Sequence, residues 1–301
     1  MKKPEELINQ DLWTLIDKAR KTTKEHFGDF MEVCSIINAK SGVCGEDCKF
    51  CAQSSHYRTH VEVYPLVEVD TIVESAKIAQ EHGAMRFGIV TSGRSVSDRE
   101  IEIIAGAIER IRKELSIETC ASLGSLSEEK FRILRQAGLE RYHHNIETSP
   151  DYYKEIVTTH PIEERIHTVK LAKSIGYQVC SGVIIGLGEN EKERIQMALL
   201  LKDLDVDSVP INILVPIKGT PLENVKQLSI KEILRTIALF RIILEDKIIK
   251  IAAGREAVLG DFQALGFIAG ANGFITGGYL TIKGRTAEED LVFINELKEI
   301  L

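Results

Sequence analysis

The sequence is poor in proline and tryptophan and has no long apolar run. Only 7 of its 301 residues are proline and one is tryptophan, which excludes proline-rich linkers and collagen-like repeats. No stretch reaches the roughly 18 consecutive apolar residues of a membrane-spanning helix. Lysine and arginine number 38 against 45 acidic residues, so the chain lacks the basic footprint needed to bind nucleic acid or an anionic membrane. Acidic residues stand near the start where a signal peptide has its apolar core, which predicts a cytoplasmic protein.

Cysteine is scarce but unevenly placed. Of the six cysteines, Cys44, Cys48 and Cys51 crowd into one short segment. A chain of this length in a reducing compartment does not need disulfides for stability. Such crowding in a cytosolic protein indicates metal or redox chemistry instead.

Short β-branched segments alternate with longer amphipathic ones along the chain. The expected strands are 31–39, 84–91, 117–123, 140–147, 177–185, 207–215, 248–253 and 272–276. The expected helices are 67–82, 97–114, 127–137, 161–175, 190–203, 229–245, 260–270 and 286–300. This alternation predicts an α/β fold, a (β/α)8 TIM-type barrel at 31–301, with an N-terminal helical extension at 1–30. A doubly wound open sheet is the alternative. In both folds, functional residues gather at the carboxyl ends of the strands.

The cysteine segment follows the first expected strand directly. Residues 44–51 read Cys-Gly-Glu-Asp-Cys-Lys-Phe-Cys, a C-x3-C-x2-C spacing. Three thiolates can bind three irons of a 4Fe–4S cluster and leave the fourth iron open to another ligand. The aromatic residue Phe50 favours this interpretation over the alternative, a structural zinc site completed by His56 or His60.

The sequence around this motif, SIINAKSGVCGEDCKFCAQSSHY at 35–57, closely resembles the biotin synthase family of the radical S-adenosylmethionine superfamily. Further segments match in order: SLGSLSEE (122–129), HHNIETSPDYY (143–153), VCSGVIIGLGE (179–189), SVPINILVPIKGTPL (208–222), AGREA (253–257) and AGANGFITGGYLT (269–281). Hydrogenase-maturation and methylornithine-forming enzymes are the nearer alternatives, and they lack the Ala-Gln-Ser-Ser and His-Asn-x-acid segments. A zinc-bound binding module is the more distant alternative.

The resemblance implies an activity and its cofactors. A 4Fe–4S cluster would cleave S-adenosylmethionine, and the 5′-deoxyadenosyl radical so formed would lead to sulfur insertion into dethiobiotin. An auxiliary iron–sulfur cluster would supply the sulfur. A donor such as flavodoxin or ferredoxin would provide the electron, and the protein would be a homodimer.

The resemblance also assigns roles to individual residues. Cys44, Cys48 and Cys51 would be the catalytic cluster ligands. The residues expected to contact S-adenosylmethionine are Phe50, Asn145, Glu147, Arg165, Gly182, Ile184, Gly186 and Glu189. Those expected to contact dethiobiotin are His144, Asn145, Asn212 and Thr281. The chain departs from the family pattern at Glu147, where aspartate is commoner, and at Ile282, where the family has a second threonine.

The remaining cysteines point to the auxiliary cluster. Cys120 and Cys180 match two of its family ligands, and Arg255 matches its arginine ligand, but Gly88 stands where the third cysteine is usual. Cys34 lies in the neighbouring expected strand, about 4.8 Å away. We therefore expect Cys34, Cys120 and Cys180 to hold this cluster, with Arg255 as a fourth ligand or a hydrogen-bond donor. The changed ligand set leaves a 2Fe–2S and a four-iron cluster both open, and the alternative for Cys34 is a buried hydrophobic residue.

Overall fold

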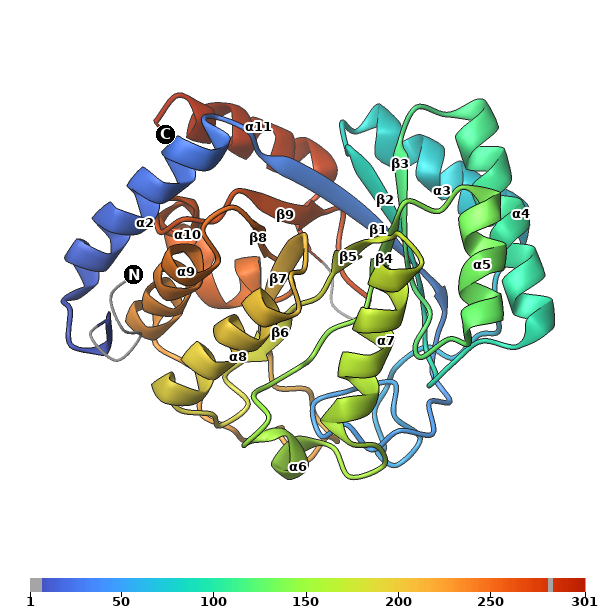
Figure 1. Ribbon diagram of the computed structural model, residues 1–301, viewed down its shortest axis with the longest axis horizontal. Helices are drawn as coiled ribbons and strands as arrows, with labels where there is room; N and C mark the ends of the chain where they lie inside the picture. Colours follow the sequence, from blue (N-terminus) through green and yellow to red (C-terminus); the bar gives the residue numbers. More distant parts are fainter. Residues whose placement is uncertain (1–6, 281–283, 301) are drawn as a thin grey trace.

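The computed structural model, which describes residues 7–280 and 284–300, has parallel strands at its centre with helices around them (Figure 1). The strands are β1 (Glu32–Lys40), β2 (Arg86–Thr91), β3 (Glu118–Ser122), β4 (Arg141–His143), β5 (Gln178–Cys180), β6 (Val183–Ile185), β7 (Ser208–Ile213), β8 (Ile248–Ile251) and β9 (Gly273–Thr276). Their order is β5-β4-β3-β2-β1-β9-β8-β7-β6, and β5 also pairs with β7. β5 and β6 are therefore two halves of one barrel strand, interrupted at residues 181–182.

The pairing of β5 with β7 closes the sheet. Cys180 of β5 is in register with Ser208 of β7, so the described strands leave no open sheet edge. The predicted (β/α)8 barrel is confirmed, and the open-sheet alternative is wrong. Each expected strand is present, and the expected strand at 140–147 is regular only as far as His143.

The helices follow the strands as the periodicity predicts. They are α3 (Val69–Glu81), α4 (Asp98–Glu114), α5 (Glu128–Ala137), α6 (Tyr153–Ile156), α7 (Ile162–Ser174), α8 (Glu191–Asp203), α9 (Ile230–Leu244), α10 (Gln263–Ile268) and α11 (Ala287–Lys298). A π-helical turn, Arg255–Leu259, and a 3-10 turn, Gly260–Phe262, precede α10. The helix expected at 260–270 is therefore shorter than predicted.

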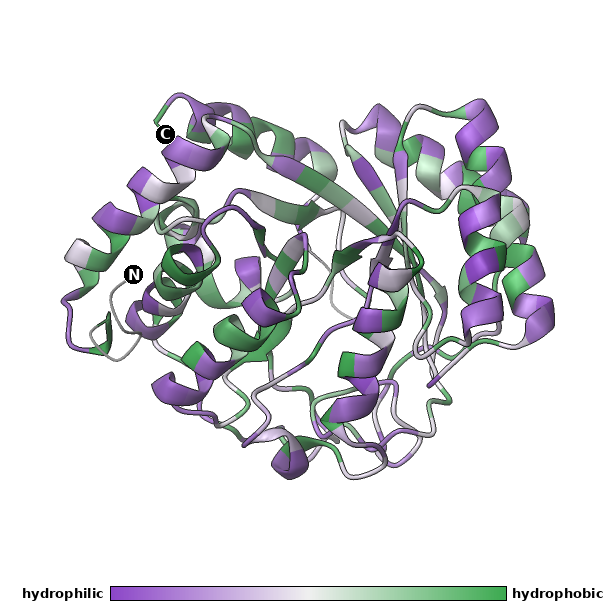
Figure 2. Cartoon of the chain, viewed as in Figure 1, coloured by the Kyte–Doolittle hydropathy of each residue, from purple (hydrophilic) through white to green (hydrophobic). Residues whose placement is uncertain are grey.

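Side-chain caps and apolar faces explain where the helices form. At the start of α4, Ser97 accepts a hydrogen bond from the Glu100 N–H, and the Glu100 carboxylate accepts one from the Ser97 N–H, which is a capping box. Ile104, Ile108 and Ile111 of this helix are fully buried, and each contributes about 1.5–3 kcal/mol by leaving water. Figure 2 shows the same pattern in the other helices, which are apolar toward the strands and hydrophilic outside.

An amino-terminal helix, α2 (Leu12–Phe27), packs against α9. Leu15 and Ala19 are fully buried there, and the Thr23 hydroxyl donates to the Gly270 carbonyl at 3.2 Å. Arg235 of α9 donates to main-chain carbonyls of residues 7–10. A helix thus lies in the expected extension, while the domain boundary at residue 30 stays a prediction. None of the helices described is both long and apolar enough to cross a membrane.

The loop between β1 and α3 positions the site. It begins at the carboxyl end of β1 and carries the three-cysteine motif, and in Figure 1 it lies at the same end of the barrel as α6. The Lys49 N–H donates to the Ile156 carbonyl at 3.0 Å. This contact joins the loop to α6, so the motif faces the elements that follow β4.

Candidate active site

The three-cysteine loop is folded by its own backbone. The Cys44 N–H donates to the Gln53 carbonyl at 3.0 Å, the Ser55 N–H donates to the Cys44 carbonyl at 2.8 Å, and the Cys51 N–H donates to the Cys48 carbonyl at 2.9 Å. All three thiols are free. Burial raises the pKa of the Cys51 thiol to about 11 and raises that of Cys48 further, and the neighbouring Cys44 adds to both shifts. Thiolates here need a positive partner, which bound iron provides.

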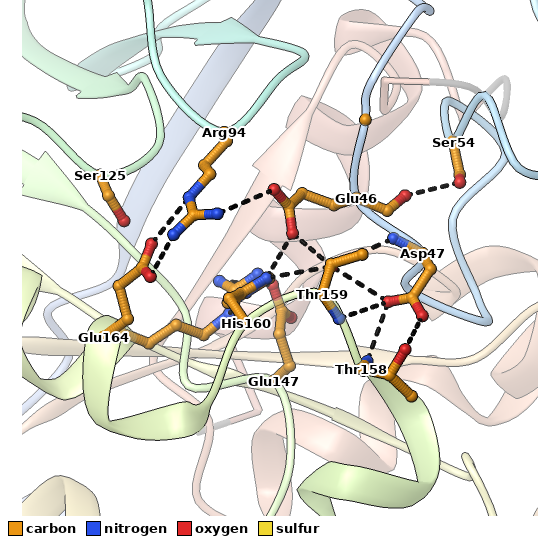
Figure 3. A network of polar contacts seen from close by, with 12 residues as sticks. Glu46, Asp47, Ser54, Arg94, Ser125, Glu147, Thr158, Thr159, His160 and Glu164 are labelled. Atoms are coloured by element: carbon orange, nitrogen blue, oxygen red, sulfur yellow. Dashed lines mark hydrogen bonds and ion pairs between the residues drawn. The ribbon is translucent and has the colours of Figure 1, made fainter.

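Two acids between the cysteines fasten this loop to residues 158–160 (Figure 3). The Asp47 carboxylate accepts hydrogen bonds from the N–H groups of Thr158 and Thr159 at 2.9 and 3.1 Å. Burial raises the pKa of Asp47, but these bonds outweigh it and bring the pKa to about 2. The Glu46 carboxylate lies 2.5 Å from Nδ1 of His160. Sequence reasoning gave these residues no role, and the acid pair inside the motif is the local signal it overlooked.

The structure brings Arg165, Asn145 and Glu147 together beside the loop. Arg165 Nη1 donates to the Asn145 carbonyl at 3.1 Å and lies 3.2 Å from the Glu147 carboxylate. Its positive charge opposes the effect of burial on the pKa of the Cys48 thiol, so the guanidinium lies near that cysteine. Phe50 and Ile184 pack, half-buried, against the apolar cluster that includes Cys48. The predicted S-adenosylmethionine residues are therefore grouped around the cysteine loop.

The glycine-rich strand end has a packing role that sequence reasoning did not identify. A Cβ atom at Gly182 would lie 2.0 Å from the Pro210 carbonyl oxygen of β7, so only glycine allows the two strands to approach. The Gly182 N–H donates to Oδ1 of Asn145 at 3.0 Å, and the Ile184 N–H donates to the Glu147 carbonyl at 2.7 Å. These bonds attach the irregular segment after β4 to β6.

Glu189 makes a set of hydrogen bonds within its own loop. Its side chain is fully buried, and the carboxylate accepts hydrogen bonds from the N–H groups of Gly186 and Leu187 at 2.9 and 2.8 Å. Arg194 Nε donates to it at 2.7 Å. Glu189 therefore shapes the loop that contains Gly186, and its predicted contact with the cofactor stays a prediction.

Replacing Glu189 with alanine is expected to lower the free energy of unfolding by about 3–5 kcal/mol, because it leaves the buried Arg194 charge and several N–H groups unpaired. Urea denaturation followed by circular dichroism measures the change. Glu109→Ala, on the exposed face of α4, is the control and should change stability by less than about 0.5 kcal/mol. Equal stability of the two variants would contradict this role for Glu189.

The residues predicted to contact dethiobiotin lie in different surroundings. His144 is buried and its Nε2 has no hydrogen-bond partner among residues 7–280 and 284–300, while burial lowers its pKa well below the usual range. An unpaired buried nitrogen is the kind of atom that a bound molecule satisfies. Asn212 donates to the Val183 carbonyl at 3.1 Å and accepts from the Ala253 N–H at 3.2 Å, so its amide also joins neighbouring strands. Thr281 lies outside the described residues.

A cavity of about 480 Å³ opens near the carboxyl end of β1. The polar side chains that line it include Asn38, Ser41, His60, Tyr64, Tyr279 and Arg285. Its size is within the range of small-molecule sites. His60 therefore lies in a cavity wall, whereas the ring of His56 is 3.0 Å from the Gly45 carbonyl.

A second group of cysteines lies inside the barrel. Cys34, Cys120 and Cys180 are buried, and the charge of Cys180 affects the pKa of both other thiols. Burial raises the pKa of Cys120 to about 12. Burial also acts on Cys180, but Lys250 and His143 outweigh it and bring its pKa down to about 6. The structure thus brings the three predicted auxiliary ligands together.

The position without a cysteine on β2 lies beside an isoleucine of β1. Gly88 is in register with Ile36 on one side and with Cys120 on the other. A Cβ atom at Gly88 would lie 3.0 Å from Cγ2 of Ile36, so the isoleucine uses the space that a side chain at 88 would need. Cys34 lies on the same strand as Ile36 but pairs with Arg86, so its thiol is displaced from Gly88 by two residues along the strand as well as by one strand across. Its role as the replacement ligand stays a prediction.

Arg255 makes its contacts with residues other than these cysteines, and its role at the auxiliary cluster stays a prediction. Its Nη2 donates to the Asp290 carboxylate at 2.6 Å, and the guanidinium lies over the Phe274 ring, 5.0 Å from its centroid. Phe274 packs against α10, outside the barrel. Lys250 of β8 lies beside the group, with its Nζ 3.1 Å from Sγ of Cys34.

The surroundings of this interior group are positively charged. The Glu32 carboxylate lies 2.5 Å from Lys250, 2.7 Å from Arg141 and 3.8 Å from Arg86. Burial raises the pKa of Glu32, but Lys250 and Arg141 outweigh it and bring the pKa to about 2. Arg86 also pairs with the Glu118 carboxylate, so three cations face two carboxylates. The excess positive charge suits a cluster whose thiolates and sulfides are negative.

Each donor set consists of three cysteines, which is the ligand type of an iron–sulfur cluster. Among the described residues, no three His, Cys, Asp or Glu side chains are placed to share one ion. An iron–sulfur cluster does not need that spacing, because each cysteine ligates a separate iron. Nothing in the geometry favours the zinc alternative.

Comparisons with known proteins agree with this chemistry. Residues 39–201 match the Radical SAM superfamily, and residues 210–298 match the Biotin and Thiamin Synthesis associated domain. The chain is 50% identical over 300 residues to a biotin synthase of Thermotoga petrophila, with 99% of each chain covered. It is 51% identical over 279 residues to a biotin synthase of Acetivibrio thermocellus, covering 93% of this chain and 87% of that one.

Solved structures support the architecture. A methylornithine synthase superposes with a TM-score of 0.83 at 20% identity, covering 98% of this chain and 91% of that one. A maturase of the FeFe-hydrogenase superposes with a TM-score of 0.82 at 18% identity, covering 98% of this chain and 70% of that one. At these identities the likeness concerns the fold alone.

Proposed function

The chain belongs to the biotin synthase family of radical S-adenosylmethionine enzymes, and from this membership we propose that it forms biotin by inserting sulfur into dethiobiotin. The observation that carries the proposal is the presence of two groups of three cysteines in one barrel. One group stands in the loop after β1, and the other lies buried inside. A radical generator and a sulfur source need two such sites within reach of one substrate.

The loop group is the proposed radical-generating site. Cys44, Cys48 and Cys51 would hold a 4Fe–4S cluster, which with S-adenosylmethionine supplies the 5′-deoxyadenosyl radical. Arg165 offers a guanidinium fork to the methionine carboxylate. The side chains of Asn145 and Glu147 would bind the ribose, and the backbone from Gly182 to Gly186 would offer hydrogen-bonding groups to adenine.

The interior group is the proposed sulfur source. Cys34, Cys120 and Cys180 would ligate the auxiliary cluster, whose sulfide becomes the sulfur of the product. Lys250 donates toward Cys34, and Glu32 holds the ammonium in place. Hydrogen bonds and positive charge of this kind tune a cluster as strongly as its ligands do. A reductant such as flavodoxin or ferredoxin is the proposed electron donor, and the homodimer stays a prediction.

Dethiobiotin is the proposed substrate, with His144, Asn145 and Asn212 around its ureido ring. Anaerobic protein reconstituted with iron and sulfide, then given S-adenosylmethionine, a reductant and dethiobiotin, should produce biotin detectable by mass spectrometry. Asn212→Ala should raise the dissociation constant for dethiobiotin about 10-fold, because a buried polar partner is lost. The exposed Asn224→Ala is the control. If the wild-type protein makes no biotin and dethiobiotin never protects it against heat, the substrate assignment is wrong.

A further inference from the structure

A chain of polar contacts runs from the three-cysteine loop to Arg165. Glu46, inside the motif, lies 2.5 Å from Nδ1 of His160. Nε2 of His160 lies 2.9 Å from the Tyr153 hydroxyl, and that hydroxyl lies 2.8 Å from Nε of Arg165. Figure 3 shows the end of this chain at Glu46 and His160. The chain connects three elements: the cluster loop, α6 and α7.

The direction of these hydrogen bonds follows from Arg165. A guanidinium can only donate, so the Tyr153 oxygen accepts from Arg165 Nε–H. The Tyr153 hydroxyl then donates to Nε2 of His160. That leaves the imidazole proton on Nδ1, where it is donated to the Glu46 carboxylate. One tautomer satisfies every member, so the chain has one arrangement.

Burial gives this arrangement its stiffness. Tyr153 is 1% exposed and the His160 side chain 5%. Breaking one bond in such surroundings leaves a polar atom unpaired where water does not replace the partner. The chain therefore resists rotation of Arg165 about its side-chain bonds.

The contacts of Arg165 leave one edge of its guanidinium for a ligand. Nε is held by the Tyr153 hydroxyl and also donates to Nε2 of His160 at 3.2 Å. Nη1 is held by the Asn145 carbonyl and the Glu147 carboxylate. Nη2 makes no hydrogen bond within residues 7–280 and 284–300. A binding site of this kind needs its ligand-contacting groups held within about 0.5 Å of the productive geometry.

We propose that Glu46, His160 and Tyr153 are positioning residues that fix the Arg165 guanidinium relative to the cysteine loop. The carboxylate-binding arginine and the cluster ligands then form one rigid unit, so that S-adenosylmethionine meets both at the correct separation. This inference rests on the proposed function. It assigns the second acid, Asp47, the simpler task of fastening the loop to Thr158 and Thr159.

Tyr153→Phe tests the proposal, because it removes one hydroxyl and keeps the ring. We expect the dissociation constant for S-adenosylmethionine, measured by equilibrium dialysis on anaerobic reconstituted protein, to rise about 10-fold. Bound iron should stay at the wild-type level. Tyr177→Phe is the matched control, since Tyr177 is also buried and donates to the Phe131 carbonyl at 2.6 Å. It should leave the affinity unchanged.

A spectroscopic measurement separates positioning from stability. S-adenosylmethionine should change the electron paramagnetic resonance spectrum of the reduced wild-type cluster, and in Tyr153→Phe this change should need about 10-fold more ligand. Glu46→Gln, which keeps the side-chain shape, should also need more ligand for this change. In the variant that combines Glu46→Gln with Tyr153→Phe, the loss of binding free energy should be smaller than the sum of the two single losses.

Wild-type affinity in both variants with full iron would overturn the proposal. So would parallel loss of iron and affinity, which indicates a merely structural role. Failure of the wild-type protein itself to bind S-adenosylmethionine would instead overturn the proposed function.

Discussion

Replacement of Cys44, Cys48 and Cys51 by alanine is expected to abolish reductive cleavage of S-adenosylmethionine. The loop from residue 41 to residue 60 contains no other cysteine, and burial raises the pKa of the Cys48 and Cys51 thiols, so thiolates there are unfavourable without a metal. Anaerobic protein given S-adenosylmethionine and dithionite should release no 5′-deoxyadenosine above the protein-free background, as measured by chromatography.

A second triple variant is the matched control for this experiment. Cys34, Cys120 and Cys180 replaced together by alanine should leave the loop group and Arg165 intact. That protein should still form 5′-deoxyadenosine but no biotin. Undiminished cleavage in the loop variant would place the radical-generating cluster elsewhere.

The sequence predicted the barrel well because each strand–helix unit carries its own local signal. Short β-branched segments mark the strands, longer amphipathic segments mark most helices, and capping residues such as Ser97 mark helix starts. The spacing from Cys44 to Cys51 is also local, so the chemistry of the loop could be inferred before any geometry was known. These features depend on residues close together in the chain.

Contacts between distant segments escaped sequence reasoning. Lys250 and Arg255 are five positions apart, and the motif favoured the arginine. The structure places Lys250 inside the barrel and Arg255 outside it, against Asp290. Which side chain faces the interior depends on strand register and on the turn after β8, and neither is visible in composition. The contact of Glu46 with His160 joins residues 114 positions apart, beyond any local pattern.

The interior group leads to the second large effect. In protein already lacking Cys44, Cys48 and Cys51, any remaining cluster should be the auxiliary one. Adding Cys34→Ala should remove most of its iron and sulfide, because Cys34 supplies the thiol that β2 lacks at Gly88. Iron and sulfide analysis with Mössbauer spectroscopy measures the loss, and the iron count before the substitution distinguishes a two-iron from a four-iron cluster.

Variants of the two basic residues complete this test. Lys250→Met should lower the iron content of the same background. The substitution removes the hydrogen-bond donor to the sulfur of Cys34 and leaves the nearby Glu32 carboxylate with one cation fewer. Lys250→Arg should retain more iron, since it keeps the charge and hydrogen-bonding capacity. Arg255→Lys should leave the Mössbauer spectrum unchanged, because Arg255 contacts Asp290 outside the barrel. A cluster that keeps its iron and its Mössbauer spectrum without Cys34 would show that this thiol is only a buried hydrophobic group. A spectrum that changes in Arg255→Lys but not in Lys250→Met would show that the arginine is the cluster's partner.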